Sequence, residues 1–385
     1  MVFRRAESVF GPHQSTHRIR RIAHPLKLSK GFSYWCQDTR VQRRLPALLG
    51  GIIVVVVALP VQARTTSSSP PAAVATDAVP AILELFKTYP VVGLGEGPHG
   101  NLEGHAFRLK LIRDPRFPTV VNDILVESGT ARYQAVMDRY IRGEGVARQE
   151  LRRVWEDTTN AGTTWDKPIY EEFFKAVRDV NARLPKGKQL RVLLGDPPIA
   201  WEFIRKRGDL RPWGMQRDLH AGLVIKREVL AKNRRALAIY GDGHFQGRGF
   251  KDNSLVNVVE RIPGTRMFTI ATRAGDLIKM QPSIASWTVP SLARIRGTIL
   301  GEKFYAQFYP MPPANGWNTV RMQDQFDAVL YLGPTPWTMT LVPKALCEDA
   351  AYMKMRLARL ALIAGAPGAT DPVGGLKKLC AEITK

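Results

Sequence analysis

Residues 91–100 read VVGLGEGPHG, a short apolar run that ends in a glycine-rich turn carrying an acid and a histidine. Residues 101–113 follow as NLEGHAFRLKLIR, with apolar positions spaced as on one side of a helix. Runs of β-branched residues and leucine without polar alternation are typical of strands that are buried on both faces. The stretch therefore predicts a strand, a turn and a helix, which is the unit that builds parallel sheets.

The same unit recurs along the chain. Short apolar runs predict six buried strands, at 91–94, 124–126, 190–194, 236–240, 267–271 and 328–332. Amphipathic stretches between them, such as 168–183 and 218–233, predict helices. We expect an α/β fold with a mostly parallel central sheet and helices on both faces. Residues 130–185 are too long for one crossover and predict a helical insertion or cap after the second strand.

Composition narrows the class of protein. The chain has 385 residues, of which 45% are hydrophobic, so a disordered chain is excluded. Its three cysteines exclude a disulfide-rich mini-protein and a multi-cysteine zinc module. The formal net charge is +22, but no helix-turn-helix, RNP or zinc-finger pattern accompanies it. We therefore expect a small-molecule substrate and no nucleic-acid partner.

The N-terminal part has the pattern of an export signal. Residues 45–61 read LPALLGGIIVVVVALPV without a charge, directly after Arg43 and Arg44, and Ala63 ends a small-residue exit. Such a pattern indicates a signal peptide within 1–63, or a retained anchor at 45–61 that would be the protein's one membrane contact. The protein is accordingly expected to be exported, either periplasmic or extracellular.

The rest of the chain divides by composition. Residues 64–79 are polar and proline-rich and predict a linker, 80–342 the α/β domain, and 343–385 a C-terminal helical segment. That last segment holds Cys347 and Cys380. They form either a disulfide that fastens the tail, or two buried free thiols, and the sequence leaves both open.

Acidic and imidazole residues follow four of the expected strands. The carboxyl ends of parallel strands meet at one edge of a sheet, where ligands bind. We therefore expect one cluster there, drawn from distant segments: Glu96, His99, Glu127, Asp196, Asp242 and His244. One acid after a strand is commonly a helix cap, but four such positions are poorly explained by capping.

Three kinds of chemistry fit these residues. The spacing Gly95, Gly97, Gly100 matches a dinucleotide fingerprint, but Glu96 inside that loop would repel a pyrophosphate. A metal site for zinc or iron would use His99, Glu127 and His244.

Acid–base catalysis needs no metal. In that reading Glu96 or Glu127 orients an imidazole, and His99 or His244 activates water. A Ser–His–Asp triad is disfavoured, because Ser128 lacks a nucleophile-elbow sequence.

The ordered set of motifs resembles the erythromycin-esterase-like family. The residues that carry the resemblance are VVGLGEGPHGNLEGHAFRLKLI from 91, ILVESGTARYQAVMDRYIRGEG from 124, KREVLAKNRRALAIYGDGHFQ from 226 and FDAVLYLGP from 326. The resemblance covers about 90–335. It also extends to the wider group of haem-binding ChaN-like proteins and Tiki/TraB metal-dependent peptidases.

The resemblance implies an exported hydrolase of an ester, lactone or amide. It implies catalytic roles for Glu96, His99, Glu127 and His244. We expect Glu103, Asp196 and Asp242 to bind the substrate, the last two because they follow expected strands at the same edge. A divalent metal or haem is the cofactor that the wider group implies, and a non-catalytic haem or iron binder is the alternative function. One departure is Gly241, where the esterase pattern carries a further histidine.

Overall fold

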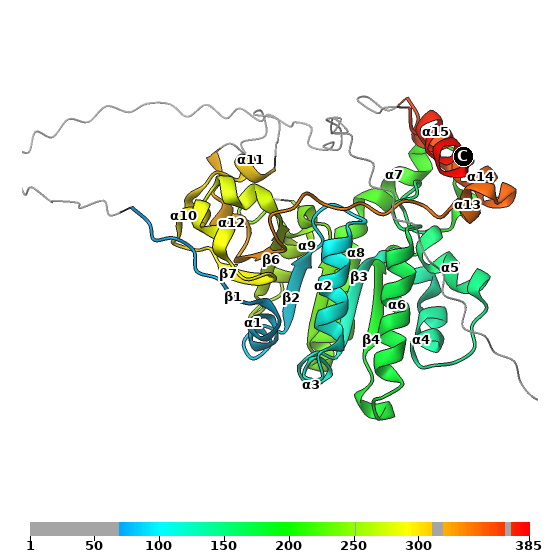
Figure 1. Ribbon diagram of the computed structural model, residues 1–385. Coiled ribbons are helices and arrows are strands. Elements are labelled where there is room, and N and C mark those ends of the chain that lie inside the picture. The colour runs from blue at the N-terminus through cyan, green and yellow to red at the C-terminus, as the bar shows by residue number, and fades with distance from the viewer. Residues whose placement is uncertain (1–68, 251, 310–318, 366–370) are drawn as a thin grey trace, which may run out of the picture. The chain divides into compact units, whose positions relative to one another are not determined.

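A computed structural model describes residues 69–250, 252–309, 319–365 and 371–385 (Figure 1). The basic leader, the apolar run 45–61 and the start of the expected linker lie outside these residues. In the part that is described, no helix is both long enough and apolar enough to cross a membrane.

Within the described ranges the strands form one sheet of eight, in the order β1-β7-β8-β6-β2-β5-β3-β4. The strands are β1 Thr76–Asp77, β2 Val91–Gly95, β3 Asp123–Thr130, β4 Arg191–Asp196, β5 Ala236–Tyr240, β6 Met267–Arg273, β7 Ser291–Arg294 and β8 Ala328–Tyr331. Every pair from β8 to β4 is parallel, while β7 pairs antiparallel with both β8 and β1. The predicted α/β fold with a mostly parallel sheet is confirmed, and all six expected strands are present.

The strands are buried on both faces, as their apolar runs predicted. In β5, Leu237 and Ile239 pack into one core cluster, and Ala236, Ala238 and Tyr240 pack into the other. Side chains alternate between the two faces of a strand, so each strand contributes to two cores.

Helices cover both faces (Figure 1). Residues of α1 to α6 belong to the first core cluster, and residues of α8 to α12 belong to the second. The helices are α1 Ala78–Leu85, α2 Leu102–Arg113, α3 Phe117–Val120, α4 Gln134–Ile141, α5 Arg148–Glu156, α6 Pro168–Asn181, α7 Arg207–Met215, α8 Arg217–Val224, α9 Leu255–Glu260, α10 Ile299–Glu302, α11 Tyr305–Phe308, α12 Met322–Gln325, α13 Lys344–Glu348, α14 Ala350–Ile363 and α15 Pro372–Thr384.

The expected insertion consists of α4, α5 and α6, between β3 and β4. All three helices contribute buried residues to the first core cluster, for example Met137, Val154 and Phe174. The helices therefore form part of the layer on that face, and the α5–α6 connection is the part of the insertion that reaches the candidate site described below.

The folded body begins earlier than the expected boundary at residue 80. Ala73 is buried, and its N–H donates to the Gln281 side chain at 2.9 Å. Strand β1 then pairs with β7. The last residues of the expected linker 64–79 thus belong to the fold, because backbone pairing holds even a polar, proline-rich sequence against a sheet edge.

The C-terminal segment is helical, and its two cysteines are bonded to each other. Cys347 in α13 and Cys380 in α15 form a disulfide with a Cα–Cα distance of 5.2 Å. The structure thus has the first of the two alternatives that the sequence left open, and such a bond contributes roughly 2–4 kcal/mol to stability. Disulfides persist in oxidising compartments, and export itself stays a prediction.

Candidate functional site

The site lies at the carboxyl ends of β2, β5 and β3, which are neighbours in the sheet. Glu96 directly follows β2, and Gly241 directly follows β5. Strand β3 pairs with β5 up to Val126, and its pairing with β4 is irregular beyond that residue. Glu127 is thus the first residue past the regular ladder, where an irregularity re-aims a side chain.

A buried asparagine fixes the turn after β2. The Asn101 side chain accepts from the Gly104 N–H at 2.6 Å, which caps α2, and its amide donates to the Glu96 and Pro98 carbonyls at 2.8 and 2.6 Å. The turn can fold this tightly because Gly97 and Gly100 have positive φ angles of 65° and 90°.

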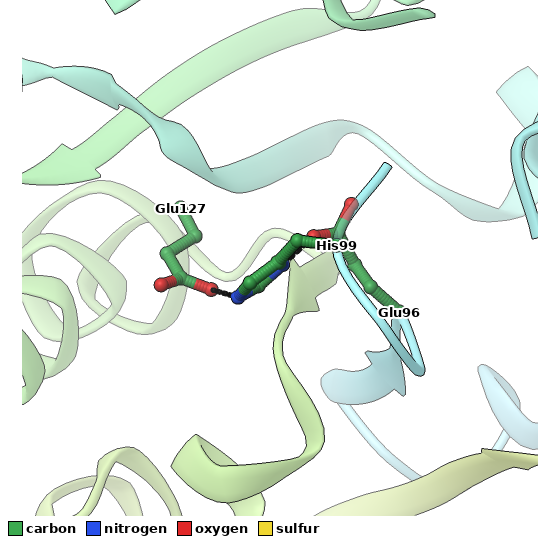
Figure 2. A group of neighbouring side chains, drawn as sticks. All are labelled: Glu96, His99 and Glu127. Carbon is green, nitrogen blue, oxygen red and sulfur yellow. Dashed lines mark hydrogen bonds and ion pairs between the residues drawn. The ribbon is translucent and has the colours of Figure 1, made fainter. Parts of the chain in front are cut away.

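The turn brings the carboxylate of Glu96 against the His99 ring. Oε2 of Glu96 lies 2.7 Å from Nδ1 of His99, so the carboxylate orients the imidazole (Figure 2). The other ring nitrogen, Nε2, faces Oε2 of Glu127 at 3.9 Å, which is an ion-pair distance and too long for a hydrogen bond. Nε2 therefore keeps capacity for another partner, and the His99 side chain is 32% exposed.

Glu127 is the centre of the cluster. Its side chain is 4% exposed and accepts from the Gly241 N–H at 2.8 Å. Nε2 of His244 lies 3.1 Å from Oε1, and the Arg217 guanidinium donates to the same oxygen. One buried carboxylate thus faces two imidazoles and a guanidinium.

The second imidazole has its own carboxylate partner. Nδ1 of His244 is hydrogen-bonded to Asp218. The side chains therefore form an ordered series, Glu96–His99–Glu127–His244–Asp218, in which each histidine lies between two acids.

Arg217 and Asp218 are functional candidates that the sequence reasoning missed. They open α8, the helix before β5. A helix that precedes a parallel strand starts at the same edge where the strands end, so a charged pair at its first residues was the available signal.

Gly241 allows the two halves of the cluster to meet. A Cβ atom there would lie 2.9 Å from Cε1 of His99 and 3.5 Å from Oε2 of Glu127. Contacts this short would displace the His99 ring. A histidine at this position, as in the pattern that the sequence resembles, requires a different arrangement of His99.

Asp196 is a buried residue that is linked to the cluster through Arg217. The N–H and hydroxyl of Thr159 donate to its two oxygens at 2.7 and 2.6 Å, and Nε of Arg217 lies 3.4 Å away. Burial raises the pKa of Asp196 to about 6, although Arg217 and Thr159 oppose the rise. Asp196 thus supports Arg217 and does not contact the imidazoles.

The structure does not bring Glu103 or Asp242 to the cluster. Glu103 accepts from the N–H of Thr338 at the surface. Asp242 accepts from the Gly97 N–H at 3.3 Å and from the hydroxyl of Tyr309. Asp242 thus contacts the turn that carries His99, and none of the contacts described joins either acid to an imidazole of the cluster.

The charges in the cluster shift three pKa values. Burial alone would raise the pKa of Glu127, but His244, His99 and Arg217 hold it well below its usual range. Burial would lower the pKa of both histidines, but Asp218 and Glu127 raise that of His244 to about 10, and Glu127 and Glu96 raise that of His99. Near neutral pH, Glu127 is therefore anionic and His244 cationic.

Three side chains of the cluster could offer donor atoms to a metal ion. One atom each of Glu96, His99 and Glu127 lies within 4.8 Å of the others, which is a geometry that a divalent ion could use. The expected ligand His244 is not in this group, and both of its nitrogens contact carboxylates.

Both carboxylates of that group already face cations. Nη1 of Arg108 lies 3.4 Å from Glu96, and Arg217 is bonded to Glu127. A dication would be repelled by these guanidinium groups and by His244. The donor set therefore fits a resident metal poorly.

No family model matches the chain, and no curated protein matches it. Its structure is similar to that of a mutant of the erythromycin esterase EreC in its open conformation, at 11% identity and a TM-score of 0.45, over 68% of this chain and 94% of that one. It is also similar to a succinoglycan biosynthesis protein, at 11% identity and a TM-score of 0.38, over 68% of this chain and 92% of that one. For haem-bound ChaN of Campylobacter jejuni the identity is 12% and the TM-score 0.34, over 51% of this chain and 86% of that one. At these sequence identities the similarity concerns the fold alone and does not assign a chemistry to the site.

Proposed function

We propose that the protein is a hydrolase of the erythromycin-esterase-like kind, which cleaves a small ester, lactone or amide. The observation that carries the proposal is the series Glu96–His99–Glu127–His244–Asp218, in which two imidazoles that are held differently share one anion. A pair of titratable groups whose surroundings separate their pKa values is the usual arrangement for an acid and a base.

His99 is the general base in this proposal. Its Nε2 lacks a hydrogen bond to Glu127, its side chain is the more exposed of the two imidazoles, and Glu96 fixes the ring through Nδ1. Neutral His99 takes a proton from a water molecule through Nε2 while the water oxygen attacks the carbonyl carbon.

Cationic His244 and Arg217 supply positive charge for the oxygen that becomes negative in the tetrahedral intermediate. The intermediate collapses as the bond to the leaving group breaks, and His99 returns its proton to that group. Glu127 keeps both cations in place and stays ionised throughout, since its pKa is held well below the usual range.

The proposal predicts a bell-shaped pH profile. His99 must be neutral to act as a base, and its pKa is raised above the ordinary 6.5. Turnover should therefore increase as the pH rises through that pKa, and decrease near pH 10 as His244 loses its charge. Initial rates on a panel of chromogenic esters and lactones, measured from pH 5 to 11, check both limbs.

The variant Glu96→Gln sharpens this test. Glu96 is one of the charges that raise the His99 pKa, so its removal should shift the rising limb to lower pH. Glu103→Gln is the matched control, because that acid sits at the surface and bonds only to Thr338 among the contacts described. Equal profiles for the two variants would contradict the role given to His99.

The alternative is a metal or haem protein with Glu96, His99 and Glu127 as ligands. We expect purified protein to contain far less than one metal ion per chain, because Arg108 and Arg217 already neutralise these carboxylates. Elemental analysis of the native protein and His99→Ala measures this directly. A stoichiometric metal that the variant loses, or a Soret band that forms on adding haem, would favour the alternative.

A further inference from the structure

The connection between α5 and α6, residues 157–167, contacts the site at three points. Thr159 donates to Asp196, as described above. The Trp165 indole lies edge-on to the His99 ring, with 4.7 Å between centroids. Nζ of Lys167 donates to the main-chain oxygen of His99 at 2.8 Å. We call residues 157–167 the site loop.

Helix α14 holds the site loop from the other side. Nη2 of Arg356 lies 2.6 Å from Asp166, and these side chains are 1% and 0% exposed. The hydroxyl of Tyr352 is bonded to the same carboxylate, and Arg359 is bonded to Asp157. This hydroxyl and the two guanidinium groups belong to positions 352, 356 and 359 of one helix, which is the spacing of a single helix face.

Main-chain contacts reinforce the attachment. Arg356 and Arg359 both donate to the Glu156 carbonyl, at 2.9 and 2.6 Å, where the site loop begins. A Cβ on Gly162 would lie 3.9 Å from the Leu360 side chain, so the middle of the loop also runs beside α14.

The C-terminal helices are fastened to one another independently of the sheet. The Cys347–Cys380 disulfide joins α13 to α15, and Leu360 and Leu376 share a small core with Cys380. Figure 1 shows these three helices together beside α5 and α7. Helix α14 is thus packed against neighbours that are themselves cross-linked, and Asp166 is the buried residue of the site loop to which it is bonded.

We propose that Arg356 is a positioning residue of the site, which acts through Asp166 to hold Trp165 and Lys167 against His99. Asp166 lies between these two residues in the sequence, so fixing its carboxylate fixes both neighbours. The proposal rests on the proposed role of His99. It assigns the C-terminal segment a function in setting the geometry of the base, beyond adding stability.

The variant Arg356→Met tests the proposal, with Lys354→Met as the control. Lys354 is exposed on the same helix and carries the same charge, so the control removes a cation without touching Asp166. Hydrogen exchange followed by mass spectrometry should show at least about tenfold faster exchange in peptides from 157–167 of Arg356→Met. The reason is that local opening of the loop no longer has to break a buried ion pair. Peptides from β2, β3 and β5 should be unchanged, and Lys354→Met should match the native protein.

On an ester that the native protein cleaves, kcat should fall by about ten- to a hundredfold in Arg356→Met with KM little changed, since a displaced base slows the chemical step. Arg356→Lys, which keeps the charge, should recover part of the loss. Faster exchange in every peptide alike, or unchanged exchange in the site loop, would overturn the proposal.

The milder variant Tyr352→Phe covers the case in which Arg356→Met fails to fold. It removes only the hydroxyl that is bonded to Asp166, and should change loop exchange in the same direction by a smaller factor. Because exchange needs no substrate, a loop that loosens in a protein without hydrolytic activity would refute the proposed function and leave the attachment of the loop intact. Normal loop exchange in both variants would refute the positioning role by itself.

Discussion

Replacing His99 with glutamine should lower turnover by two to four orders of magnitude, the range that a positioned general base supplies. Glutamine has similar reach and can still bond to Glu96, but it cannot take a proton from water. The loss should appear in kcat, because the variant keeps the shape and most of the polarity of the site. Stopped-assay rates on the best ester or lactone of the panel, at the pH optimum of the native protein, measure the effect.

His105→Gln is the control for this variant. His105 is on α2 near His99 in the sequence, is buried, and contacts Glu172 on α6. The loss of His105 should lower the free energy of unfolding only slightly, on the scale of one weakened hydrogen bond. Turnover should change by less than a factor of about three. If both variants retained similar turnover, water activation by His99 would be wrong, and Glu127 would be the next base to test.

The two imidazoles differ because of what surrounds them. His244 lies between Asp218 and Glu127 with a contact to each, and this holds its charge. His99 has one close acid, and its second contact, to Glu127, is 3.9 Å long. The shorter contacts around His244 bind its proton more firmly. The same two side chains can therefore serve as a permanent cation and a reversible base.

Much of the fold and the centre of the site could be predicted from the sequence. Buried parallel strands have continuous apolar runs, and their carboxyl ends meet at one edge. Both rules depend only on short stretches of one sequence, and they correctly predicted that Glu96, His99, Glu127 and His244 lie together. The short antiparallel strands β1 and β7 lack such runs, because a strand of two to four residues is too short to show a detectable pattern.

The remaining contacts depend on packing between distant segments. Glu103 was expected near His99, but the cap by Asn101 starts α2 in a direction that places Glu103 beside Thr338. Arg356 and Trp165 are 191 positions apart in the sequence, and Arg356 contacts Asp166, the residue that follows Trp165. Periodicity does not encode a contact of this kind, so only the folded chain reveals it.

The stability of the native protein should decrease as the pH rises from 6.5 toward 10. His244 has an ordinary pKa of 6.5 when unfolded and about 10 when folded. Between these values the folded state binds a proton that the unfolded state has released, so folding stability falls with increasing pH. Below pH 6.5 the contribution is fully present. The slope is limited to about 1.4 kcal/mol per pH unit, which gives a total on the order of a few kcal/mol.

His244→Gln should remove the part of this fall that His244 contributes, while His99, whose pKa is also raised, keeps its own part. Urea unfolding at intervals from pH 6 to 10 gives the free energy of unfolding for both proteins, and the difference between the curves isolates His244. His220→Gln is the control, because burial lowers the pKa of His220, so its own contribution to stability increases with pH up to about 6.5 and adds no fall above that value. A slope in His244→Gln that is as steep as the native slope up to pH 10 would show that the Asp218–His244–Glu127 contacts do not hold the proton. The cationic role of His244 in the proposed mechanism would fail with it, since an imidazole that is neutral at the working pH cannot stabilise a developing oxyanion by its charge.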